Sequence, residues 1–195
     1  MIAFTVDKLM EAMYNEPMSN NVADAISCSL RGFRLPRYHE IPNVGLYLEQ
    51  TTKYINQCIQ PLGFENVTNT MIRNYVKHGL ITNPVKKQYT ADHIAHLIAL
   101  ALLKQVTPLE HINDLFQLLA QGGTYSVPVA YDYFCEELEN ILYFRFALKG
   151  TIDEVGVTSS LEKEMLRSAV TAVSHIVYLN RCFLILEEQK HENSI

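Results

Sequence analysis

The chain has 195 residues, of which 48% are hydrophobic and 19% are charged, so it can bury one sizeable core and should be folded over most of its length. No uncharged apolar stretch reaches the roughly 18 residues that a membrane span needs. The N-terminus lacks the basic start of a targeting peptide. The four cysteines lie far apart and form no CxxC pair, which predicts reduced thiols in a cytoplasmic protein.

The net charge of −5 is unevenly distributed along the chain. Between Arg31 and Lys104 there are nine Lys and Arg against four Asp and Glu, a local charge of +5, whereas the remainder carries seven against seventeen. A basic middle between acidic flanks indicates a nucleic-acid-binding section in the centre of the chain. Chance clustering is the alternative, because five excess charges need not share one face.

The predicted elements are helices nearly throughout, beginning after an extended segment that Pro36 and Pro42 punctuate. The first strong helix is predicted over 44–59. Its apolar positions recur at three- and four-residue steps, as on one face of a helix: Leu48, Thr51, Ile55, Cys58 and Leu62.

A second, shorter helix is predicted over about 68–78. Thr68 can cap its N-terminus by accepting a first-turn N–H, and Gly79 stands where a left-handed residue ends a helix. Leu80 is placed to fold back on the last turn. The inward stripe consists of Met71, Ile72, Tyr75 and Val76.

A third helix over 91–106 is apolar almost all round and is predicted to be central to the core. A fourth ends at Gly122, and two long helices separated by 151–158 follow it. This pattern predicts an all-α protein, with a two-stranded wing at most. It divides into an N-terminal helical segment (1–30), a DNA-binding module (31–122) and a helical dimerisation or effector region (123–195).

On a helix with 100° per residue, one face of the 68–78 segment is polar and basic. Its members are Asn69, Thr70, Arg73, Asn74 and Lys77. Arg and Asn can bridge base edges and Lys can neutralise phosphates, which predicts a DNA-binding helix-turn-helix. The alternative is a solvated surface, but such faces usually mix in acids, and no acid occurs from Asn66 to Ala91.

The stretch VTNTMIRNYVKHGLI (67–81) is similar to the recognition-helix signature of MerR-type winged-helix regulators. The longer span of about 30–115 resembles a bacterial family catalogued as domain of unknown function 1836, regarded as MerR-like regulators. The resemblance implies a winged helix-turn-helix in which Arg73 and Asn74 read base edges. It also implies that Lys77, Lys86 and Lys87 contact phosphates and that Tyr89 braces the wing.

Two arginines precede this module. Arg34 and Arg37 are candidates for an arm that contacts the DNA backbone or the minor groove. Arginines beside prolines are equally often plain loop charges, and both interpretations stay open.

Other candidate sites are weaker. His93 and His96 have i,i+3 spacing, but a metal site needs three or four convergent ligands, so we expect histidines at the edge of the core. No phosphate-binding glycine motif or nucleophile motif occurs. We therefore expect no enzyme, no metal and no cofactor.

The region after residue 123 is rich in aromatic residues, namely Tyr125, Tyr131, Tyr133, Phe134, Tyr143, Phe144, Phe146, Tyr178 and Phe183. These could line a pocket for a small apolar effector, or form ordinary core with a dimer seam, which is the simpler interpretation. The expected partners are double-stranded DNA and a second copy of the chain, since paired recognition helices match half-sites about one DNA turn apart. The competing function is a helical adaptor that binds protein through the same scaffold.

Overall fold

The computed structural model describes residues 32–121, 125–143 and 161–192. The predicted N-terminal segment (1–30), the predicted domain boundary near 122, and Phe144 and Phe146 lie outside the described residues, as does the side chain of Phe183. Among the described residues, no helix combines the length and the hydropathy that are needed to cross a lipid bilayer.

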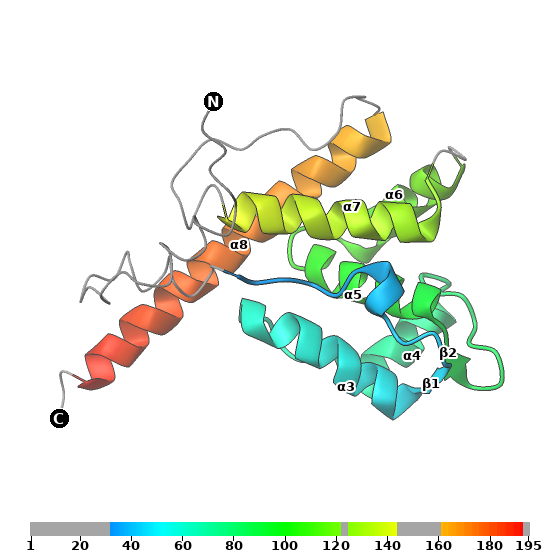
Figure 1. The fold of residues 1–195 in the computed structure, drawn as a ribbon, viewed down its shortest axis with the longest axis horizontal. Coiled ribbons are helices and arrows are strands. Elements are labelled where there is room, and N and C mark those ends of the chain that lie inside the picture. Colours follow the sequence, from blue (N-terminus) through cyan, green and yellow to red (C-terminus); the bar gives the residue numbers. More distant parts are fainter. Residues whose placement is uncertain (1–31, 122–124, 144–160, 193–195) are drawn as a thin grey trace, which may run out of the picture.

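The described chain is mainly helical, as predicted, with one small antiparallel sheet (Figure 1). The elements in chain order are η1 (Tyr38–Glu40), β1 (Leu46–Tyr47), α3 (Leu48–Ile59), η2 (Gln60–Leu62), α4 (Asn69–Lys77), β2 (Gln88–Tyr89), α5 (Ala91–Leu103), α6 (Leu109–Gln121), α7 (Val127–Asn140) and α8 (Leu161–Glu192).

Helix α5 is the centre of the core, as its nearly uniform apolar sequence predicts. Its side chains are buried from Ala91 to Leu103 except at Asp92 and His96. It packs against α3 on one side and against α7 and α8 on the other. The buried core is one cluster that runs from Leu35 to Val177, so it includes residues on both sides of position 122.

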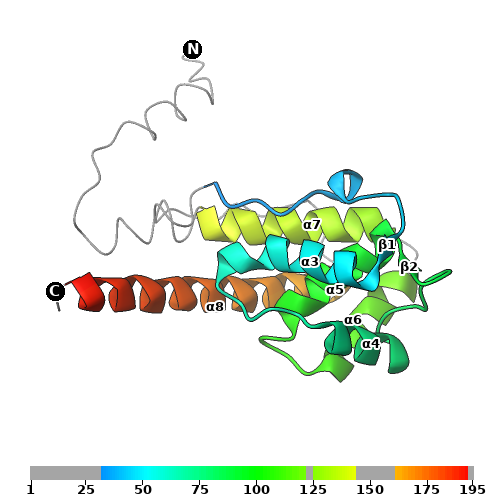
Figure 2. The same ribbon diagram turned by 90° about the horizontal axis from the view of Figure 1, so that it is seen from below.

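Helices α7 and α8 pack side by side (Figures 1 and 2). Glu137 of α7 is 2% exposed and accepts a hydrogen bond from Arg167 Nε of α8 at 3.0 Å. The buried carboxylate therefore has a charged partner, without which its burial would be strongly unfavourable. The C-terminal end of α8 extends beyond the other described helices (Figure 2).

The first predicted helix begins later than its apolar periodicity indicated. Leu46 and Tyr47 form β1, which pairs antiparallel with β2 through Leu46–Tyr89 and Tyr47–Gln88. The helix proper starts at Leu48. Gly45 precedes the strand because a Cβ there would lie 2.7 Å from Gln88 Cβ, so only glycine fits without a shift.

Candidate nucleic-acid interface

Local sequence signals fix both ends of α4. The Thr68 hydroxyl accepts the N–H of Met71 at 3.2 Å, which confirms the predicted N-cap. At the other end Gly79 has φ of 74°, and the N–H groups of Gly79 and Leu80 bond to the carbonyls of Val76 and Tyr75. These two bonds are the Schellman pattern, so the helix stops abruptly and the chain turns toward the wing.

The polar face of α4 points away from the core. Ile72 is fully buried and Tyr75 is 5% exposed, which anchors the helix by its apolar side. Four residues on the other side are exposed, and their side chains form no hydrogen bond or ion pair with the described residues: Thr70, Arg73, Asn74 and Lys77. We call these four residues the α4 face.

Asn69 was predicted to belong to this face but turns back toward α3. Its Oδ1 accepts a hydrogen bond of 2.6 Å from the Thr52 hydroxyl, and the residue is half-buried. Position 69 is the first residue of the helix, where the side chain can reach the preceding helix. Asn69 therefore links α3 to α4.

Asn56 fixes the connection between α3 and α4 more strongly, and sequence reasoning missed it. Its amide donates to the Val67 carbonyl at 2.9 Å and accepts the Val67 N–H at 2.8 Å. The two bonds satisfy a backbone segment that has no regular structure of its own. A single polar residue on a helix carries no sequence signal for such a role.

The wing is a tight turn over residues 85–88 with a lysine at each central position. The Gln88 N–H bonds to the Val85 carbonyl at 2.9 Å, and φ is 52° at Lys86 and 64° at Lys87. Positive φ at both central residues defines a type I′ turn, a position where Asn and Gly are strongly preferred. Two exposed lysines therefore occupy a backbone conformation that costs each of them about 1–2 kcal/mol.

Helix α5 anchors the wing through His93. The Thr90 N–H donates to His93 Nδ1 at 3.0 Å, and His93 Nε2 lies 3.1 Å from the Thr82 hydroxyl. Tyr89, 4% exposed, packs edge-on against the same ring with centroids 5.7 Å apart. Burial lowers the pKa of His93, which favours the neutral ring that these contacts require.

The α4 face and the wing lie close together. The positive charge of Arg73 acts on the Tyr89 phenol and lowers its pKa, opposing the larger effect of burial, which raises it. In Figure 2, α4 and α7 lie on opposite sides of α3 and α5, and β1 and β2 lie at one end of α3. Neither the α4 face nor the wing contains an acid, because none occurs between Glu65 and Asp92.

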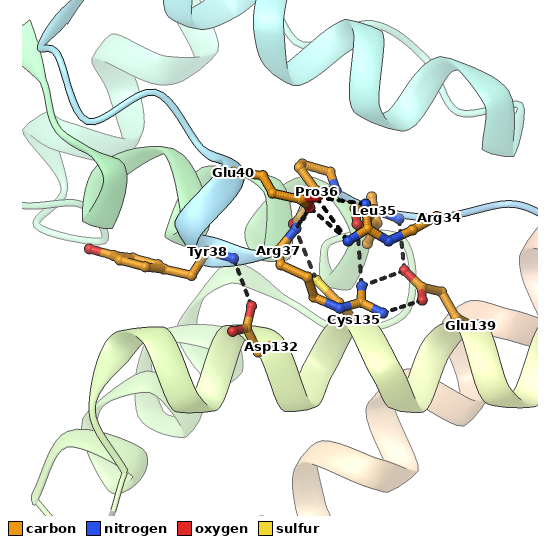
Figure 3. Close-up of polar contacts among 9 residues, drawn as sticks. All are labelled: Arg34, Leu35, Pro36, Arg37, Tyr38, Glu40, Asp132, Cys135 and Glu139. Atoms are coloured by element: carbon orange, nitrogen blue, oxygen red, sulfur yellow. Dashed lines mark hydrogen bonds and ion pairs between the residues drawn. The ribbon is translucent and has the colours of Figure 1, made fainter.

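The side chains of Arg34 and Arg37, the candidate DNA arm, form ion pairs with acids of the same chain (Figure 3). Arg37 donates two hydrogen bonds to the Glu139 carboxylate of α7, at 2.7 and 2.6 Å. Arg34 pairs with Glu40 at 2.9 Å. Neither side chain lies on the α4 face or the wing, so we leave both out of the candidate interface.

The same segment is held to α7 along its backbone. Glu139 also accepts the Leu35 N–H at 2.8 Å, and Asp132 accepts the Tyr38 N–H at 2.7 Å. In Figure 3 the side chains of Asp132, Cys135 and Glu139 all rise from α7 toward this segment. Residues 34–38 are thus part of the scaffold behind the interface.

Within the described part of the chain, no group of three or more His, Cys, Asp or Glu side chains is placed to hold a metal ion. His93 serves the wing, and His96 donates from Nδ1 to the Asp92 carbonyl at 2.8 Å.

Comparison with known families adds one finding. The family described as "Domain of unknown function (DUF1836)" matches residues 36–134, about half of the chain. The chain belongs to this family. The DUF1836 match begins at the segment held by Glu139 and ends within α7, so it includes the α4 face and the wing. No curated protein and no solved structure matches the chain.

Proposed function

We propose that this protein is a cytoplasmic, sequence-specific DNA-binding regulator of transcription with a MerR-like winged helix-turn-helix. In this proposal α3 supports α4, α4 enters the major groove, and the wing turn contacts the neighbouring backbone. The role is one of binding and involves no catalysis.

The chemistry of the α4 face suits a duplex. An Arg side chain can donate two hydrogen bonds to guanine O6 and N7, and Asn can bridge adenine N6 and N7, so Arg73 and Asn74 are proposed to read bases. Lys77 follows Arg73 by one helical turn and is proposed to contact phosphate with the Thr70 hydroxyl. At 1.5 Å per residue, nine-residue α4 is about 13 Å long, which suits a few base pairs.

The observation that carries the proposal is the wing turn. Stability alone would favour Asn or Gly at positions 86 and 87, because both residues have positive φ. Two exposed lysines there, unpaired with the described residues, indicate that charge at the tip serves a purpose other than stability. Phosphate is the partner that a cationic tip next to a base-reading helix would meet.

A second copy of the chain completes the proposal. One short helix specifies too few base pairs for a unique site, and a two-fold dimer would place two such helices about one DNA turn apart, roughly 34 Å. We propose such a homodimer. The operator it would read is a palindrome or a near-palindrome.

The proposal is tested by the salt dependence of duplex binding. Wild-type protein and the Lys86→Ala/Lys87→Ala variant are titrated against a labelled duplex enriched from a random pool by the wild type. Because each lysine should release about one counterion, the slope of log affinity against log salt should become shallower by about 2 in the variant.

Its matched control is Arg34→Ala/Lys53→Ala, which removes two exposed charges outside the interface. This variant should keep the wild-type slope. Equal slopes for all three proteins, or no duplex enriched by the wild type, would refute the proposal.

A helical adaptor remains the second candidate because apolar side chains are exposed in the wing and beside it. Val44, Tyr47 and Val85 are 67%, 55% and 66% exposed. Aromatic and aliphatic residues on a surface are typical of protein interfaces. For an adaptor, Tyr47→Ser should abolish capture of a protein partner while Lys86→Ala/Lys87→Ala leaves it intact.

A further inference from the structure

An apolar cavity lies on the side of α5 that faces α6 and α7. Its volume is about 280 Å³, and its wall is formed by side chains of these three helices, by Tyr125 and Ser126 before α7, and by Leu166 of α8. The pocket is partly open to solvent, since Ala120 and Ser126 in its wall are exposed. Concave, mostly apolar pockets with a few polar groups are the usual binding sites for small molecules in proteins.

The wall is built from small residues opposite large ones. Ala95 and Ala99 of α5 and Ala130 of α7 leave the space, while Phe116, Leu119 and Val127 border it and are only half-buried. Half-buried phenyl and branched side chains would lose more water on contact with an apolar ligand. Apart from His96, no residue in the wall has an acidic or basic side chain.

Four side chains in the wall carry polar atoms, namely His96, Tyr125, Ser126 and Tyr131, and the hydrogen bond of His96 defines its role. A carbonyl oxygen can only accept, so the 2.8 Å contact with the Asp92 carbonyl means that His96 Nδ1 carries a proton. In the neutral ring Nε2 is then an acceptor, and it forms no hydrogen bond with the described residues. The ring is held edge-on against Phe116, with centroids 5.2 Å apart.

We infer that this cavity binds a neutral, flat aromatic molecule of two rings that carries one hydrogen-bond donor. An engineered apolar cavity of about 150 Å³ takes up benzene, so a space nearly twice as large suits about ten to twelve non-hydrogen atoms. The donor, a hydroxyl or an N–H, pairs with His96 Nε2. This inference does not depend on DNA binding, and its test contains no DNA.

The test uses the full chain and a pair of probes that differ in one donor, 2-naphthol and 2-methoxynaphthalene. Calorimetry should give 2-naphthol a dissociation constant of about 0.1 mM or lower. The methyl ether, which cannot donate, should bind about fivefold more weakly. His96→Phe should remove this difference, because the ring shape is kept and the acceptor is lost.

The place where 2-naphthol binds is tested by a substitution that fills the cavity. Ala130→Phe should weaken 2-naphthol binding about tenfold or more. Ala172→Phe places the same ring on α8 outside the cavity wall and should leave the affinity for 2-naphthol unchanged. Because a bulky substitution can disturb folding, the wild type labelled at alanine methyls is measured too. Nuclear Overhauser contacts from the probe to Ala95, Ala99 and Ala130 locate it directly.

Three results would overturn the inference. They are failure of the wild type to bind 2-naphthol at millimolar concentration, contacts from the probe to alanines outside the cavity, and an undiminished preference for 2-naphthol in His96→Phe.

Discussion

Arg37 and Glu139, 102 residues apart in the sequence, form a bidentate ion pair in which each side chain is 17% exposed. The pair joins the segment before β1 to α7. Its geometry matches the planar fork of the guanidinium to the carboxylate, and the Leu35 N–H completes the set of donors to Glu139. Two parts of the chain that the sequence assigns to different regions are thereby held together.

Removing one partner should destabilise the fold, because the other charge remains largely buried. Arg37→Ala should lower the free energy of unfolding by about 2–3 kcal/mol, measured by urea denaturation. Arg34→Ala should shift the urea midpoint little, since the Arg34–Glu40 pair is exposed. If the two substitutions lower the free energy of unfolding equally, the Arg37–Glu139 pair stabilises the fold no more than the exposed Arg34–Glu40 pair.

Stability should fall as the pH falls below the ordinary pKa of histidine because of His93. Burial is the largest effect and lowers its pKa in the folded state, whereas a hydrogen bond to the Asn83 backbone and the charge of Asp92 raise it by less. The unfolded chain then takes up a proton more readily than the folded chain, so acid favours unfolding. The contribution of His93 to the free energy of unfolding is complete above 6.5, the pKa of histidine in the unfolded chain, and is lost progressively as the pH falls below that pKa.

The measurement is the melting temperature from pH 7.5 to 5, compared with His93→Gln. Glutamine can still accept the Thr90 N–H from the third helical position but does not titrate. Its melting temperature should vary less over this interval. The account of the wing anchor fails when both proteins show the same dependence.

Backbone strain at the wing predicts that a substitution by glycine stabilises the fold, whereas such substitutions usually destabilise it. Lys87→Gly should raise the free energy of unfolding by about 1 kcal/mol, because glycine adopts positive φ without a steric penalty. Lys53→Gly, the same substitution within α3, should lower it by about 1 kcal/mol. Urea denaturation of the two variants provides the comparison, and a loss of stability in both would argue against a strained turn.

Several features of this fold follow from local sequence rules. Thr68 and Gly79 mark the ends of α4 as predicted, because capping depends on neighbouring backbone groups alone. The apolar composition of α5 likewise predicts its central position. These signals act within a few residues, and sequence reasoning is strongest there.

Contacts between distant residues could not be read in the same way. Strand β1 has two residues, and its partner is more than forty positions away, so no periodicity reveals it. The clamp of Asn56 on Val67 and the engagement of Arg37 by Glu139 depend on how helices pack. For the same reason, an exposed Arg and an internally paired Arg look identical in the sequence.

Within the proposed interface, Arg73 should determine sequence preference and Lys77 should not. Arg73→Ala should lose about 1–3 kcal/mol of discrimination between the enriched duplex and a scrambled one, since Arg73 is proposed to meet a base edge and Lys77 a phosphate. Lys77→Ala should weaken binding to both duplexes by the same factor. Competition titrations at a fixed salt concentration measure the difference, and equal loss for both duplexes in both variants would mean that charge acts without base readout.

The most direct measurement of the central claim is amide hydrogen exchange of the full chain with and without the enriched duplex. We expect slower exchange over 69–78 and 82–89, which contain the α4 face and the wing, and no change in the middle of α7 on the opposite side. Unchanged exchange in both segments while the duplex is bound, or protection confined to α7, would contradict the account.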